Sequence, residues 1–167
     1  MSWVTFENIY FLFLAAVTLH NLEEAVLLPD GSPQAGRWHR PAEKIPFRFA
    51  VLVLTLLAYL CAYLALMGGK QSVGIYLLGG YAFAMLVNVF FPHLLAAVWL
   101  QKYVPGLGTA LALNLPACSA LLILLYREEY VFFWPLIITG GLFAAGSIPL
   151  TRLLFRLGKR VEEKLWE

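Results

Sequence analysis

Hydrophobic residues occur along this chain in five long blocks, which short clusters of polar residues, glycine and proline separate. The blocks lack the strict alternation of half-buried strands, and a bilayer offers no partners to unpaired backbone groups. Each block therefore predicts a membrane-spanning helix. The expected helices cover about residues 8–28, 47–67, 73–100, 106–126 and 131–152. The sequence thus predicts an all-α fold, a five-helix transmembrane bundle in a single domain (1–167) that ends in a basic cytoplasmic tail (153–167).

Prolines interrupt two of the predicted helices. Pro92 lies inside the third block and Pro116 inside the fourth. A proline inside a helix removes one backbone hydrogen bond and bends the helix, so we expect kinks at both positions. A kink at Pro92 would turn the side chain of His93 toward the helix face that carries Asn88.

Composition places the chain in a membrane, and the basic residues orient it. Hydrophobic residues make up 61% of the sequence and charged residues 13%, whereas soluble domains average about 25% charged. With the N-terminus outside, ten of the twelve Lys and Arg residues fall on the inner side, as the positive-inside rule favours. No basic n-region or small-residue cleavage site is seen, so we expect no removable signal peptide. These features predict an N-out/C-in protein of a prokaryotic cytoplasmic (inner) membrane.

The first predicted helix carries polar groups that are costly in a bilayer. The motif His20-Asn21-Leu22-Glu23-Glu24 lies near the inner end of a block with the ~20-residue length of a spanning helix. A central charge costs about 2.5–3.5 kcal/mol on insertion scales, and such residues usually serve a function. Residues three and four apart share a helix face, so His20, Glu23 and Glu24 are expected to point the same way.

Other helices bring polar groups to the same depth. At ~1.5 Å per helical residue, His20 and His93 lie about 12 Å below the inner boundary and Asn114 about 13 Å. Imidazole and carboxylate groups gathered at one level suit a divalent transition metal, for which we consider zinc or iron. The predicted metal ligands are His20, Glu23, Glu24 and His93. The residues expected around them, holding an imidazole or a carboxylate in place, are Asn88, Asn114 and Arg48.

Each of these residues also has a purely structural interpretation. Glu23 and Glu24 could end their helix in the headgroup layer, with both carboxylates solvated. His93 could be a hydrogen-bonded packing residue beside a proline kink. Asn88 and Asn114 are of a type that more often donates hydrogen bonds between helices than binds a ligand.

Three motifs together carry a resemblance to a known family. They are His20-Asn-Leu-Glu23-Glu24, Asn88-Val-Phe-Phe-Pro-His93, and Pro105-Gly-Leu-Gly-Thr109 with Asn114-Leu-Pro116. They resemble the HXXEE-domain family of small integral membrane proteins, over roughly residues 8 to 130. The resemblance implies that His20, Glu23, Glu24 and His93 belong to the characteristic polar set of that family. It implies no particular activity.

The preferred hypothesis is an intramembrane metal-dependent enzyme, a hydrolase or an oxidoreductase. Its metal would be held by His20, His93 and one of the two glutamates, Glu23 or Glu24, and the other glutamate would act as the catalytic general acid/base. A metal with an open coordination position can activate water or oxygen. The substrate would be an apolar or lipid-like molecule that reaches the site from the inner leaflet.

Two other functions are compatible with the same residues. In a small proton-coupled transporter or carrier, the His/Glu cluster would relay protons, and a homodimer would supply the rest of the path. In a structural or assembly protein, both glutamates would be replaceable. The expected partners are the lipid bilayer and a lipophilic or amphipathic small molecule. We expect no nucleic acid, because the basic tail is short.

Overall fold

The computed structural model describes residues 5–28 and 44–165. Within these ranges the chain forms helices and no strand, and five helices are long and apolar enough to cross a membrane. The all-α, five-helix prediction is confirmed. The spans are α1 (Phe6–Leu27); α2 (Lys44–Gly68); α3 (Val73–Asn88) continued by η2 (Val89–Leu94) and α4 (Leu95–Leu100); α5 (Leu107–Thr109) continued by η3 (Ala110–Asn114) and α6 (Leu115–Arg127); and α7 (Phe133–Leu165).

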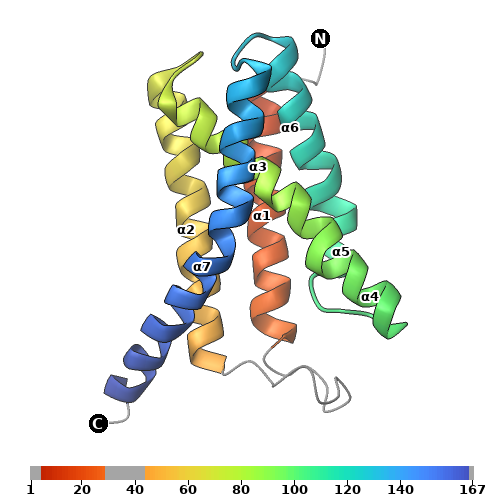
Figure 1. Cartoon of the computed structure of the whole chain (residues 1–167), viewed down its shortest axis with the longest axis vertical. Coiled ribbons are helices and arrows are strands. Elements are labelled where there is room, and N and C mark those ends of the chain that lie inside the picture. The colour runs from red at the N-terminus through yellow and green to blue at the C-terminus, as the bar shows by residue number, and fades with distance from the viewer. Residues whose placement is uncertain (1–4, 29–43, 166–167) are drawn as a thin grey trace.

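Helix α1 lies in the middle of the bundle, with α2 on one side and α6 on the other (Figure 1). Helix α7 packs mainly against α3 and α2. The apolar core lies in the half of the bundle nearer the N-terminus, around Phe13, Leu78 and Leu121. The polar motif of α1 is placed one to two turns farther along, beyond the end of this core.

Two of the spans are irregular next to the prolines at which kinks were expected. In η2 the backbone of Phe91 leaves helical geometry (φ −134°, ψ 114°), which is the kink expected at Pro92. In the fourth span the irregularity is the π-helical segment η3, and Pro116 follows it two residues later in α6. Such π-helical segments are rare and often occur at functional sites. Both face α1.

Helix α7 is longer than its apolar block predicts. It was expected to end near residue 152, but it continues without a break to Leu165, so the basic segment is an extension of the last span. Leu154 is buried, and a side chain at Gly158 would collide with the backbone of Pro46. The extension therefore packs closely on the start of α2, and this packing holds it helical.

Candidate metal centre

Two helical segments supply a compact group of three side chains. His20 and Glu24 lie one turn apart on α1, and His93 lies on η2 just after the kink. The potential metal-binding atoms of these residues all lie within 4.8 Å of one another. The Glu24 carboxylate oxygen is 3.1 Å from His93 Nε2 and 4.0 Å from His20 Nε2. The two imidazole rings are nearly perpendicular, with centroids 4.9 Å apart.

The three side chains differ in burial. His20 is completely buried, His93 is 2% exposed, and the Glu24 side chain is 18% exposed. The carboxylate therefore faces the accessible side of the group, while the imidazoles lie within the bundle. A carboxylate in this position can neutralise a cation while leaving one side open to an incoming molecule.

His93 has no hydrogen-bond partner among the described residues on either ring nitrogen. Its Nε2 atom is close to Glu24, yet the carboxylate oxygen is not aligned to accept an N–H hydrogen bond from the ring. Leaving a buried polar atom unsatisfied costs about 1–3 kcal/mol. A packing histidine would avoid this cost, whereas a metal ligand keeps a ring nitrogen free for the ion.

A chain of hydrogen bonds fixes the orientation of His20. The Thr109 hydroxyl donates to Glu23 Oε2 (2.6 Å), because a carboxylate can only accept. The same hydroxyl then accepts from His20 Nδ1 (3.1 Å), which places the ring proton on that nitrogen. The Nε2 atom therefore carries the lone pair, which accepts a hydrogen bond from the Asn88 side-chain amide (3.3 Å) and lies 4.0 Å from a carboxylate oxygen of Glu24. Neutral imidazole held in one tautomer by a partner of its other nitrogen is the usual arrangement for a metal ligand.

Glu23 is not part of the three-residue group. Its carboxylate accepts from the backbone N–H groups of Gly106 (2.9 Å) and Thr109 (3.1 Å), from the Thr109 hydroxyl and from the Tyr103 hydroxyl. These donors lie where the fourth span begins, and the free N–H groups of a helix start favour a negative charge. Both glutamates were candidate ligands, with one expected at the metal and the other as general acid/base. In the structure Glu24 lies with the two histidines, and Glu23 is directed to the start of the fourth span.

The residues expected around the ligands are only partly in place. The side-chain nitrogen of Asn88 lies 3.3 Å from His20 Nε2. Asn114 is completely buried, and its side-chain amide has no hydrogen-bond partner among the described residues. Arg48 donates to the backbone carbonyl of Ala25 (3.0 Å), and among the described ion pairs Glu24 pairs with the two histidines and not with Arg48. Asn21, which the helix geometry separates from the motif face, donates to Thr55 of α2 (2.8 Å).

Sequence reasoning did not assign a role to Tyr103, Gly106 or Thr109 in positioning the motif. Thr109 and Gly106 belong to a Gly-Leu-Gly-Thr run just before a predicted helix, and such a run is typical of a helix start with exposed N–H groups. That signal indicates a place for an anion. It does not indicate which acidic residue, more than 80 positions away, supplies it.

Replacement of Gly106 by alanine is expected to disturb the centre. Gly106 has φ +88°, and a Cβ atom there would lie 2.6 Å from His93 Cε1 and 3.0 Å from Glu24 Cγ. We expect metal affinity to fall at least ~10-fold, as for other changes that displace ligands, and unfolding free energy to fall by about 1–3 kcal/mol. Gly69→Ala is the matched control, since Gly69 also has positive φ (+69°) but its Cβ would meet no atom within 4 Å. Equal metal affinity in the two variants would contradict this placement of Gly106.

Tyr103 is expected to ionise at a higher pH than an ordinary tyrosine. It lies in the linker between the third and fourth spans, and donation of its hydroxyl to Glu23 raises the pKa of the phenol. The hydrogen bond therefore stabilises the fold below pH 10 and is lost as pH rises through the raised pKa. Ultraviolet titration of wild type against Tyr103→Phe measures this pKa. In Glu23→Gln it should return toward its usual value, and an unchanged pKa there would contradict the contact.

Comparison with known proteins agrees with these motifs. Residues 11–121, which contain His20, Glu24 and His93, match the family described as "Protein of unknown function with HXXEE motif". The chain is 37% identical over 155 residues to "Uncharacterized protein YrkK" of Bacillus subtilis (strain 168), covering 92% of this chain and 98% of that protein. No solved structure matches. The chain belongs to the HXXEE family.

Proposed function

We propose that this protein binds a divalent transition metal, zinc or iron, through His20, Glu24 and His93, and acts as a metal-dependent membrane enzyme. The observation that carries the proposal is the buried His93 imidazole. Its nitrogens have no hydrogen-bond partner in the part of the chain that the structure describes, although a carboxylate and a second imidazole lie beside it. Two imidazoles and one carboxylate are the ligand set of several catalytic zinc sites and of non-haem iron oxygenases.

The spacing of the three residues supports a single ion. Ligand atoms at about 2.0–2.2 Å from one metal lie at most about 4.4 Å apart, and the three side chains offer atoms within 4.8 Å of one another. Small side-chain adjustments are therefore sufficient. Three protein ligands leave a coordination position open, where a bound water or oxygen molecule would be activated. This arrangement is compatible with hydrolysis by zinc and with oxidation by iron.

The expected substrate is an apolar or lipid-like molecule. The partly exposed side of Glu24 is the accessible side of the centre, and it lines a cavity among apolar side chains of α2, α3 and α7. In the N-out/C-in orientation that the basic residues favour, this side opens to the inner leaflet of the cytoplasmic membrane. A substrate would then reach the centre from the bilayer.

Metal analysis of the purified protein tests the proposal. We expect about one equivalent of zinc or iron in protein purified without chelator, and stoichiometric rebinding after the metal is stripped. Wild-type protein that binds neither metal, in detergent and in lipid nanodiscs, would refute it. Elemental mass spectrometry and isothermal titration calorimetry supply the two readouts.

A proton-coupled carrier is the second candidate, and one observation favours it. The side chains of His93, Glu24, His20, Thr109 and Glu23 form a continuous series of short contacts. Such a series can relay protons within a membrane. Proton flux into liposomes that Glu24→Gln abolishes, in protein free of metal, would favour the carrier over the enzyme.

A further inference from the structure

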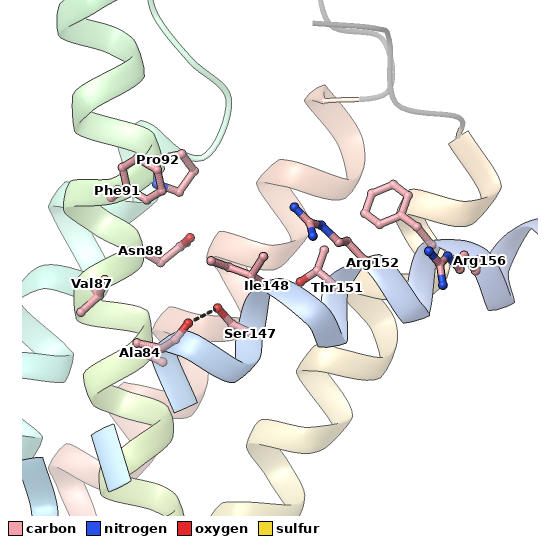
Figure 2. Close-up of a pocket in the computed structure, with 12 residues that line it drawn as sticks. Ala84, Val87, Asn88, Phe91, Pro92, Ser147, Ile148, Thr151, Arg152 and Arg156 are labelled. Atoms are coloured by element: carbon pink, nitrogen blue, oxygen red, sulfur yellow. Dashed lines mark hydrogen bonds between the residues drawn. The ribbon is translucent and has the colours of Figure 1, made fainter. Parts of the chain in front are cut away.

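A groove lies between α3, η2 and α7, and Figure 2 shows the side chains that line it. Its volume is about 690 Å³, and a second cavity of about 470 Å³ extends from it toward α1 and α2. Both volumes fall within the ~300–1,000 Å³ of typical ligand pockets. The residues that line both cavities are Ala84, Asn88, Ser147, Thr151 and Phe155. The two cavities therefore adjoin.

One end of the groove is positively charged. Arg152 and Arg156 lie one turn apart on α7, so they share a helix face, and both line the groove. Within residues 5–28 and 44–165, no acidic side chain forms an ion pair with either guanidinium. Most of the remaining wall is apolar, and it includes Val87, Ile148 and Phe155. The groove thus has the polarity of an amphiphile with an anionic head.

The other end of this space adjoins the candidate metal centre. Asn88 lines both cavities, and its side-chain nitrogen lies 3.3 Å from His20 Nε2. Glu24 lines the second cavity directly. A molecule held by Arg152 and Arg156 would therefore lie along α7, with its apolar part directed toward Asn88 and Glu24.

We propose that this groove binds an anionic phospholipid, with the phosphate on Arg152 and Arg156 and an acyl chain in the apolar part. Arginine forms paired hydrogen bonds with phosphate oxygens. Basic pockets between membrane helices commonly hold anionic lipid headgroups. The lipid's identity as the substrate rests on the proposed function, whereas its binding in the groove does not.

Headgroup recognition is tested by native mass spectrometry of wild-type protein exchanged into detergent with phosphatidylglycerol or phosphatidylcholine. We expect one retained phosphatidylglycerol, bound at least tenfold more tightly than phosphatidylcholine. Arg152→Gln/Arg156→Gln should lose this preference. The matched control is Arg160→Gln/Lys164→Gln, which removes the same charge from the same helix outside the groove. Equal loss in the two double variants, or equal retention, would overturn the proposal.

Lipid binding in the groove is also tested by placing a large side chain inside it. Ala144 lines the groove and its neighbour Ala145 does not, so Ala144→Trp should reduce lipid retention at least tenfold while Ala145→Trp should not. Retention unchanged by Ala144→Trp would overturn the proposal.

Metal content measured on the same samples separates the two proposals. Lipid bound without metal would leave the groove assignment standing and refute the metal centre. Metal bound without a lipid preference would leave the metal centre standing and refute the groove assignment. Fatty acid retained in place of phospholipid would overturn the choice of occupant.

Discussion

Replacement of His93 by leucine is expected to abolish metal binding while leaving the metal-free protein at least as stable as wild type. The substitution removes one of three ligands, so metal affinity should fall by more than ~100-fold, since changes that merely disturb the orientation of ligands already cost ~10–100-fold. The imidazole makes no hydrogen bond in the described structure. Its removal relieves a buried polar group that costs about 1–3 kcal/mol.

Thermal unfolding with and without metal measures both halves of this prediction. Wild-type protein should gain about 2.7 kcal/mol when free metal is at 100 times its dissociation constant, and His93→Leu should gain nothing. Asn21→Ala is the control, because Asn21 is a buried polar residue of α1 that bonds Thr55 instead of facing the centre. It should lose stability and keep its metal. If His93→Leu destabilises the metal-free protein like an ordinary core substitution, His93 is a packing residue.

The two adjacent glutamates are expected to respond in opposite ways to the same substitution. Glu23→Gln should lower the unfolding free energy by about 1.5–3 kcal/mol, the value of a charge-assisted hydrogen bond. The carboxylate accepts four hydrogen bonds. Gly106 N–H donates to one oxygen and Thr109 N–H to the other, so the amide nitrogen of glutamine would face one of these two N–H groups in either orientation. Glu24→Gln should have little effect on stability, because Glu24 is partly exposed and, among the described residues, its carboxylate contacts the two imidazoles but accepts no hydrogen bond.

Metal affinity is expected to distinguish the same two variants in the opposite way, with the larger loss in Glu24→Gln. Glu24→Gln removes the only carboxylate of the three-residue group, so affinity should fall at least ~10-fold. Glu23→Gln acts on the metal only through Thr109 and His20, so its effect should be smaller in protein that remains folded. Denaturant titration and calorimetry on both variants supply the comparison. A larger loss of affinity in Glu23→Gln would mean that the motif uses its first glutamate at the metal.

The helices could be predicted from the sequence because length and apolarity alone decide whether a segment can span a bilayer. The pairing of His20 with Glu24 also follows from the sequence, since residues four apart share a helix face. His93 could be placed at the same depth by counting residues from the end of its span. These predictions need only the local geometry of a helix and the position of one end of the span.

The place of Glu23 could not be predicted in the same way. Adjacent residues on a helix point about 100° apart, so two glutamates in sequence face different neighbours. Which neighbour each one meets depends on how the fourth span packs against α1. The extension of α7 depends likewise on its fit against Pro46 at the start of α2. The groove is a product of that packing, and no run of residues in the sequence corresponds to it.

The hydrogen bonds from the start of the fourth span to Glu23 also constrain biogenesis. Their donors are 80 to 86 positions away from the carboxylate, so three spans and the start of the fourth must be synthesised before Glu23 can meet them. Until then the first span carries an acidic residue without donors. A chain truncated before Thr109 would therefore lack the hydroxyl that orients His20, and the three side chains of the proposed metal site would be held in place only after most of the protein has been translated.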